Sequence, residues 1–205
     1  MKCIPAGRSR RKMKIIGIIA SPRKEGNTAW IVNKILEGAK ERGAETQAWY
    51  SSELTIEPCR GCLCCHTDGD RGCIIDDDMQ ELYDAIDQAD AIVLGSPVYM
   101  GQMSAQAKIF TDRLFAQISP RFSPHYKEKV TKKKLLLVFT QGNPDPGMFK
   151  EYFDYTKKMF QLLEFDVGEV VVVAGMRDEP AQERKGLDTA MKEIGASLVP
   201  GQCPG

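Results

Sequence analysis

Short, nearly continuous apolar segments alternate along the chain with longer amphipathic ones. A short run of Ile, Val and Leu without a polar face is typical of a strand buried on both faces of a parallel sheet. The pattern predicts five strands, at 14–20, 46–50, 91–95, 135–139 and 167–174. Apolar side chains recur at helical spacing between them. This spacing predicts helices at 28–43, around 79–86, and at 105–115, 149–163 and 179–198.

Strands that alternate with helices predict an α/β fold, a three-layer α/β/α sandwich around a five-stranded parallel sheet with right-handed crossovers. In such folds, ligands bind beyond the carboxyl ends of the strands, which meet at one edge of the sheet. The loops that follow the first four strands should therefore open onto the same edge.

The charge balance narrows the classes of partner. The 205 residues carry 28 basic and 28 acidic side chains, which gives no overall basic signal for nucleic acid. No apolar run approaches the ~18–20 residues that cross a bilayer, and nothing resembles a secretory signal. We expect a cytoplasmic protein that binds neither nucleic acid nor membranes.

The first twelve residues differ in composition from the rest. Residues 1–12 hold five basic and no acidic side chains, leaving 23 basic against 28 acidic in the remainder. We expect a basic N-terminal tail, either loosely docked or acting as a contact patch, before a single domain at 13–205.

The loop after the first strand has the composition of a phosphate site. Residues 21–28 read Ser-Pro-Arg-Lys-Glu-Gly-Asn-Thr and lead directly into a helix. Backbone amides, hydroxyls and the helix N-terminus can all bind an anion in this arrangement. The loop matches neither the P-loop nor the dinucleotide-binding motif, and a plain strand–helix turn is the alternative.

The loops after the third and fourth strands have the composition of a site for a flat ring. Residues 96–104 are apolar and contain Gly101, and their amides can bond the edge of a flat heteroaromatic ring while Tyr99 and Met100 contact its face. The loop that begins at Thr140 is rich in turn-forming residues. Together the three loops predict a ligand with a phosphate and a flat ring.

The loop after the second strand, at 58–78, is rich in cysteine. Cys59, Cys62, Cys65 and Cys73 have the spacing C-x2-C-x2-C-x7-C. Three thiolates in one tight loop and a more distant fourth can hold a 4Fe–4S cluster in a reducing compartment. A zinc site and a loop without metal are the alternatives, and Cys64 is a fifth thiol of open role.

Other polar residues of this loop have simpler interpretations. His66 could be a metal ligand or a group that contacts the ligands, but a solvated side chain is the expected case. The three aspartates at 76–78 complement the dipole at the start of the next helix.

These motifs resemble the flavodoxin-like NADPH-dependent FMN reductase family, and most of all the iron–sulfur flavoproteins. The resemblance covers about residues 13–175. It implies the strand order 2-1-3-4-5, and FMN with its phosphate in the 21–28 loop, its ring against 97–103 and the 140–143 loop beside the ring. The implied FMN-binding residues are Ser21, Arg23, Gly26, Asn27, Thr28, Pro97, Val98, Tyr99, Met100, Gly101, Gln102, Thr140, Gly142 and Asn143.

The resemblance also implies an activity and an assembly. We expect an FMN-dependent oxidoreductase that passes electrons through a 4Fe–4S cluster and FMN to a small acceptor such as a quinone, oxygen or peroxide. The electron donor is ferredoxin or NAD(P)H, and the assembly is a homodimer or homotetramer with FMN near a subunit interface. No catalytic side chain is expected, because FMN carries the chemistry.

Three alternatives remain at this point. The first is an NAD(P)H-dependent FMN or quinone reductase without a cluster, and the second is an electron carrier of the flavodoxin type that is not an enzyme. The third is a zinc-stabilised interaction domain with an empty flavin cleft.

Overall fold

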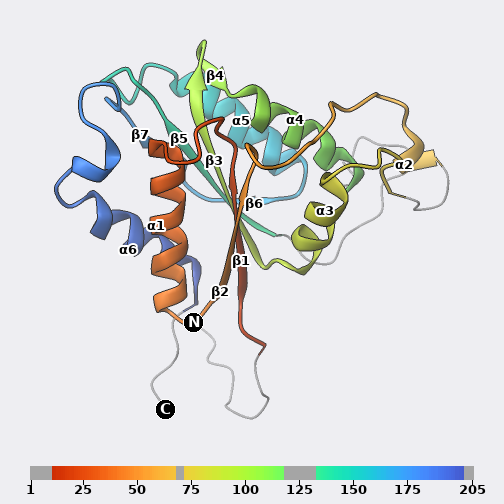
Figure 1. The fold of residues 1–205 in the computed structure, drawn as a ribbon, viewed down its shortest axis with the longest axis horizontal. Helices are drawn as coiled ribbons and strands as arrows, with labels where there is room; N and C mark the ends of the chain where they lie inside the picture. Colours follow the sequence, from red (N-terminus) through yellow and green to blue (C-terminus); the bar gives the residue numbers. More distant parts are fainter. Residues whose placement is uncertain (1–10, 68–71, 118–132, 201–205) are drawn as a thin grey trace.

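A parallel sheet forms the middle layer of the molecule. The computed structural model describes residues 11–67, 72–117 and 133–200. The main strands are β1 (Lys14–Ile19), β2 (Glu45–Tyr50), β3 (Ala91–Tyr99), β5 (Lys134–Thr140) and β6 (Asp166–Val167). They run parallel in the order β2-β1-β3-β5-β6, which confirms the predicted fold class and strand order (Figure 1).

Helices cover both faces of this sheet. The helices are α1 (Asn27–Glu41), α2 (Cys64–Thr67), α3 (Met79–Gln88), α4 (Ala105–Arg113), α5 (Lys150–Leu162) and α6 (Leu187–Leu198). Two short 3-10 helices, η1 (Leu114–Ala116) and η2 (Ala181–Glu183), adjoin them. Helices α1 and α6 lie on one side, and α3, α4 and α5 lie on the other.

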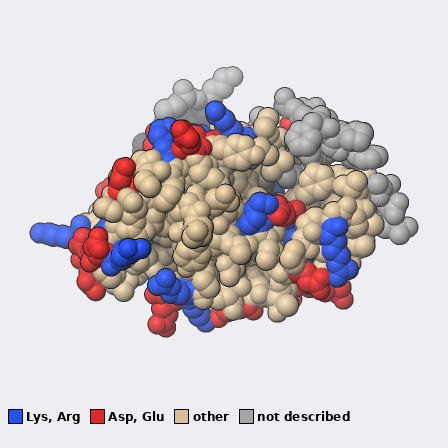
Figure 2. Space-filling model, turned by 90° about the horizontal axis from the view of Figure 1, so that it is seen from above, with Lys and Arg blue, Asp and Glu red and all other residues tan. Residues whose placement is uncertain are grey.

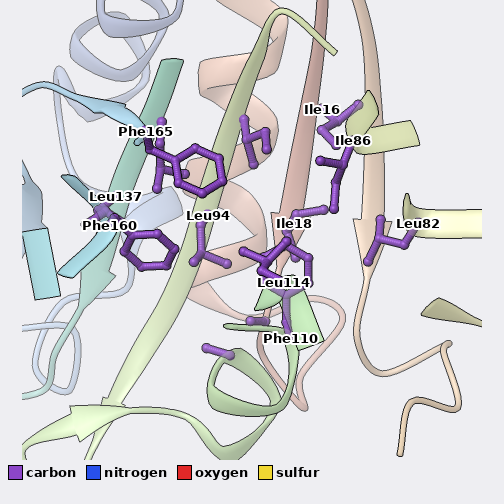
Figure 3. Close-up of a cluster of buried hydrophobic side chains, with 14 of the residues drawn as sticks. Ile16, Ile18, Leu82, Ile86, Leu94, Phe110, Leu114, Leu137, Phe160 and Phe165 are labelled. Carbon is purple, nitrogen blue, oxygen red and sulfur yellow. The ribbon is translucent and has the colours of Figure 1, made fainter. Parts of the chain in front are cut away.

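Alternate strand residues supply two separate cores. In β1, Ile16 and Ile18 belong to the cluster that α3, α4 and α5 cover, and Figure 3 shows them beside Ile86 of α3 and Leu114 of η1, whereas Ile15 and Ile19 face α1. This alternation follows from the period of two in a strand, and a strand buried on both faces must be apolar at nearly every position. The continuous apolar runs in the sequence are therefore explained by the two cores.

The fifth predicted strand is interrupted. Lys134 of β5 pairs with Asp166, 32 positions on, whereas Val138 pairs with Val171 of β7 (Val171–Val173), 33 positions on. One extra residue is thus accommodated between β6 and β7, which is a β-bulge next to Gly168. The expected continuous strand at 167–174 is wrong in this respect.

The last predicted helix begins later than expected. Pro180 precedes η2, and Gly186 adopts φ +82° immediately before α6. A residue in the left-handed region cannot continue a helix, so the expected start at 179 moves to Leu187.

Several expected segments lie outside the described residues. These are residues 1–10 of the basic tail and 68–71 of the cysteine loop; residues 118–132 and 201–205 are also outside the described ranges. Arg11, at the end of the tail, pairs with Asp90 at 2.6 Å. Of the helices in the described ranges, none is long and apolar enough to traverse a bilayer.

Candidate functional site

The loops that follow β1, β3 and β5 meet at the carboxyl edge of the sheet. Hydrogen bonds hold two of them to neighbouring strands: the amide of Ala20 in the first loop donates to the carbonyl of Gly95 in β3 at 2.8 Å, and the amide of Gln141 in the third loop donates to the carbonyl of Val173 in β7 at 3.0 Å. Figure 2 looks onto the molecule from the side of this edge, where uncharged residues occupy most of the middle and charged residues lie mainly around the rim. The predicted convergence of these loops is therefore present.

The loop after β1 presents an open helix N-terminus. Ser21 Oγ accepts from the Arg23 amide at 3.2 Å, and the Gly26 amide donates to the Arg23 carbonyl at 3.3 Å. Gly26 occupies the N-cap position of α1, and in the described chain no side chain caps this end. The first turn contains no acidic residue. The amides of this turn and the helix dipole are therefore available to an anion.

Two predicted phosphate residues have structural partners. Asn27 donates from Nδ2 to the Met176 carbonyl at 3.3 Å and accepts from the Ala181 amide at 2.9 Å. The hydroxyls of Thr28 and Thr140 lie 2.7 Å apart, and both side chains are buried. Asn27 therefore holds the loop to the segment before α6, and the two threonines join the first and third loops.

A tight hairpin carries the predicted ring-binding residues. Strand β3 continues to Tyr99, beyond the expected end at 95, and pairs with β4 (Gln102–Met103) through Val98 and Tyr99. Met100 and Gly101 form the turn with φ of +49° and +79°, as a type I′ turn requires. The expected open loop at 96–104 is thus wrong in form, although its residues do lie at the sheet edge.

Met100 is strained and fully exposed. A non-glycine residue with positive φ is uncommon, and the Met100 side chain is 100% exposed. Strain that local packing does not explain is a mark of ligand sites and interfaces. The tip of the hairpin thus carries an apolar side chain that packs against no other part of the described chain.

A serine network fixes the base of the hairpin. Ser104 Oγ donates to the Ala20 carbonyl at 2.6 Å and caps α4 by accepting from the Ala107 amide at 3.1 Å. The Ser104 amide donates to Ser96 Oγ at 2.9 Å. Tyr152 of α5 accepts from the Met103 amide at 3.1 Å. The hairpin is therefore held from both sides, and the sequence did not predict the hydrogen bonds of Ser96, Ser104 and Tyr152.

The loop after β5 folds on itself and adds a basic residue. Gln141 is buried and donates from Nε2 to the carbonyls of Asn143 and Asp145, at 3.2 and 2.6 Å. The position of a Cβ on Gly142 would lie 3.5 Å from Arg177. Arg177 was not predicted from the sequence. It lies beside Gly142 and next to Met176, which Asn27 contacts, and so it stands at the rim of the site.

The four predicted cysteine ligands line one small cavity. Its other walls include Ile75, Phe115 and Ala116. Cys59 and Cys62 are exposed, and Cys65 and Cys73 are half-buried. Among the residues from 11–67, 72–117 and 133–200, no three His, Cys, Asp or Glu side chains converge closely enough to hold a single metal ion.

The cysteine thiols influence one another electrostatically. Burial raises the pKa of Cys65, and the neighbouring Cys73, Cys62 and Cys59 raise it further. The backbone amide and thiol of Cys64 lower the pKa of Cys62 by hydrogen bonding. Cys65 is therefore a weaker acid than an ordinary thiol, and Cys62 a stronger one.

His66 is not a solvated side chain. Its Nε2 lies 2.7 Å from the Phe115 carbonyl, and the two rings are 4.4 Å apart. His66 thus anchors α2 to the end of α4.

An ion pair at the base of the cysteine loop was not predicted. Arg113 Nη1 and Nη2 bind Asp77 at 2.6 and 3.0 Å, and the two side chains are 0% and 5% exposed. Asp77 also accepts from the amides of Glu57 at 2.8 Å and Met79 at 3.1 Å. Burial opposes ionisation of Asp77, but these hydrogen bonds outweigh it and hold its pKa below the ordinary value.

A groove joins the cysteine loop to the hairpin. It has a volume of about 750 Å³ and runs between α4 and α5. Cys59 and Gly61 line it together with Gln102, Met103 and Tyr152. The cysteine loop and the predicted ring site therefore border the same groove.

Known proteins resemble the chain in sequence. A family model described as NADPH-dependent FMN reductase matches residues 13–203. The iron-sulfur flavoprotein of Methanosarcina thermophila is 48% identical over 101 residues, which are 49% of this chain and 52% of that protein. An iron-sulfur flavoprotein of Methanocaldococcus jannaschii is 45% identical over 101 residues, 49% of this chain and 51% of that protein. The chain spans about half the length of these curated relatives.

Solved structures share the fold. An NAD(P)H:quinone oxidoreductase from Methanothermobacter marburgensis has a TM-score of 0.73 at 15% identity, covering 92% of this chain and 100% of that one. A flavodoxin from the domain Archaea has a TM-score of 0.57 at 14% identity, covering 91% and 96%. The family model extends over nearly all of the sequence, and the chain therefore belongs to the NADPH-dependent FMN reductase family.

Proposed function

We propose that the protein is an FMN-dependent oxidoreductase that uses a 4Fe–4S cluster to pass electrons between a donor and a small acceptor. The observation that carries this proposal is the groove shared by the cysteine loop and the hairpin, with Cys59 at one end and Gln102 at the other. A cluster in the loop and a flavin at the hairpin would lie at two ends of one surface. The family supports FMN, and the names of the curated relatives support the cluster.

The sheet edge fits a flavin mononucleotide. The open N-terminus of α1 would hold the phosphate, and the backbone from Val98 to Gln102 would position the ring. The hydroxyl of Thr28, in the first turn of α1, lies 2.7 Å from that of Thr140 at the end of β5, which ties the proposed phosphate site to the start of the third loop. FMN, when bound, accepts a hydride or single electrons, and the chain's part is to hold and orient it.

The cysteine loop fits a cluster better than a zinc ion. In a 4Fe–4S cluster each thiolate binds its own iron, whereas zinc draws four ligands to within about 2.3 Å of one atom. Cys59, Cys62, Cys65 and Cys73 line one cavity without converging on a point. Its apolar walls, which include Phe115, would limit the access of water.

A second copy of the chain is the proposed partner at the face of the groove. Large apolar side chains are exposed at the hairpin, in α5 and just before it, and one of them, Tyr155, lines the groove. They are Tyr99, Met100, Met148, Tyr155 and Leu162. Exposed apolar patches of this kind mark interaction surfaces. We propose a homodimer or homotetramer, with a cytoplasmic location and with ferredoxin or NAD(P)H as donor.

Anaerobic purification followed by flavin, iron and acid-labile sulfide analysis tests the proposed function. We expect stoichiometric FMN with about four irons and four sulfides per chain. FMN without iron, together with steady-state oxidation of NAD(P)H, would instead indicate a reductase without a cluster. A colourless protein that takes up no FMN would refute the proposal.

Substitution of Gly101 by valine should weaken FMN binding about tenfold, equivalent to about 1.4 kcal/mol. The residue has φ +79°, which costs other residues roughly 1–2 kcal/mol, and an added Cβ would lie 3.5 Å from Phe149. Fluorescence titration of the FMN-free protein measures the affinity. Gly168→Val is the matched control, since no atom lies within 4 Å of its added Cβ. Equal FMN affinity in Gly101→Val and wild type would count against the hairpin as the ring site.

A further inference from the structure

The side chain of Arg113 is buried beside the cysteines, and one of its nitrogen atoms, Nε, is unpaired in the described chain. Arg113 lines the same cavity as Cys59, Cys62, Cys65 and Cys73. Its Nη1 donates to the Glu57 carbonyl at 2.9 Å and both terminal nitrogens bind Asp77. Within the described part of the chain, its buried Nε has no hydrogen-bond acceptor. A buried N–H group without a partner is costly and calls for an explanation.

The positively charged guanidinium of Arg113 lies beside the cysteine loop. Asp77 balances the guanidinium on the side away from Nε, and the Tyr83 hydroxyl donates to the Arg113 backbone carbonyl at 2.8 Å. Burial is the largest influence on both pKa values: it raises the pKa of Tyr83 but opposes the rise in the pKa of Arg113, which comes mainly from the hydrogen bonds to Asp77. The Cys73 thiol adds a smaller rise to each pKa. Cys73 therefore lies within electrostatic reach of Arg113.

We propose that Arg113 is a positioning residue that sets the reduction potential of the iron–sulfur cluster. The Nε–H group is the donor available to the sulfur atoms of the site, and the fixed positive charge favours the state with one more electron. That electron comes from the donor of the proposed function, on which this inference rests, and no bond is formed or broken. The buried setting matters because a charge acts more strongly where water does not screen it.

Substitution of Asp77 tests the direction in which the reduction potential shifts. Replacing Arg113 by glutamine removes a positive charge and should lower the potential, whereas Asp77→Asn removes a negative charge and should raise it. A residue that merely held the loop in shape would shift the potential in the same direction in both variants. Arg113→Lys keeps the charge and should change the potential less than Arg113→Gln.

The experiment is a potentiometric titration of the anaerobically purified holoprotein, followed by electron paramagnetic resonance of the cluster. We expect Arg113→Gln to lower the equilibrium constant for one-electron reduction about tenfold, or 59 mV. We expect Asp77→Asn to raise it at least threefold, an estimate from the strength of partly desolvated charge pairs. The matched control is Lys108→Gln on the same helix, whose side chain is 60% exposed in a pair with Asp112; it should change the constant less than about twofold.

The outcomes distinguish a failure of this inference from a failure of the proposed function on which it rests. Wild-type protein without iron would refute the proposed function, whereas a cluster whose potential is the same in all variants would refute the role of Arg113 alone. A shift of equal size in Lys108→Gln would also overturn it, because net charge would then explain the effect. If Arg113→Gln loses the cluster or fails to fold, a raised potential in Asp77→Asn still supports the inference, and an unchanged or lowered one overturns it.

Discussion

Replacing Cys62 with alanine will remove the iron and leave FMN bound. The cysteines belong to the loop between β2 and α3, whereas the α1 N-terminus and the hairpin that would hold FMN belong to other segments. Loss of one thiolate removes an iron ligand and should leave the flavin contacts intact. Iron analysis should fall from about four atoms per chain to near zero, with unchanged FMN content. Cys59→Ala should behave in the same way.

Cys64→Ala is the matched control for this result. Cys64 lies between the proposed ligands and interacts with Cys62, but it does not line the cavity that the other four share. We expect it to keep its iron. Loss of both cofactors in Cys62→Ala would contradict the separation of the two sites, and loss of iron in Cys64→Ala would require a different set of ligands.

Breaking the buried ion pair should produce the largest change in stability. Substitution of Arg113 by methionine leaves Asp77 buried and unpaired, and we expect a loss of about 3–5 kcal/mol in the free energy of unfolding. The double variant Arg113→Met/Asp77→Leu should recover most of this loss, because two apolar side chains can replace a buried pair. Denaturant unfolding of the purified protein measures both values.

The control for the ion pair is an exposed pair on the same helix. Lys108→Met breaks the contact with Asp112. Because the two side chains are 60% and 45% exposed, this change should lower the free energy of unfolding by less than about 1 kcal/mol. A similar cost in Lys108→Met and Arg113→Met would show that burial does not determine the effect.

The ion pair between Arg113 and Asp77 should make the free energy of unfolding depend on pH in the acidic range. The pKa of folded Asp77 is held below its ordinary value, so its contribution is complete above the unfolded value of about 3.9. It is lost as the pH falls through that value toward the folded pKa, because the unfolded state then binds the proton more readily. Asp77→Asn should flatten this part of the stability profile.

The features that sequence predicted well are local and periodic. The strands of β1, β3 and β5 and the helices after them follow from runs of apolar residues, and the open N-terminus of α1 follows from the residues around Gly26. The edge of the sheet then brings the loops together, since parallel strands end on one side. These signals are contained in stretches of about ten residues.

The features that sequence missed depend on contacts between distant segments. Arg113 and Asp77 are 36 positions apart, and nothing local shows that they meet. A signal was nevertheless present: Arg113 lies at helical spacing from Ala107 and Phe110, on the inward face of α4. A charged residue in an apolar stripe deserves a search for a buried partner.

The turn at Met100 and Gly101 also escaped prediction. Hairpins are signalled by Asn-Gly or Asp-Gly between alternating strands, and methionine is an unusual residue for positive φ. The segment predicted as a loop therefore contains the end of β3 and all of β4, which pair with each other. Asn27 was assigned to phosphate for its residue type, but its amide is used by Met176 and Ala181, which lie about 150 positions along the chain.

The placement of the cysteine loop has a consequence for how this scaffold can diversify. The loop leaves the fold near Glu57 and returns near Asp77, and the amide of Glu57 is bonded to the Asp77 side chain at 2.8 Å. Of the residues between them that the structure describes, none belongs to a strand of the sheet. A shorter connection across this point would preserve every pairing of β2 with β1 and the packing of α3. The cysteine loop is thus a detachable module, which a protein lineage could gain or discard while retaining the parallel sheet and the helices that pack on it.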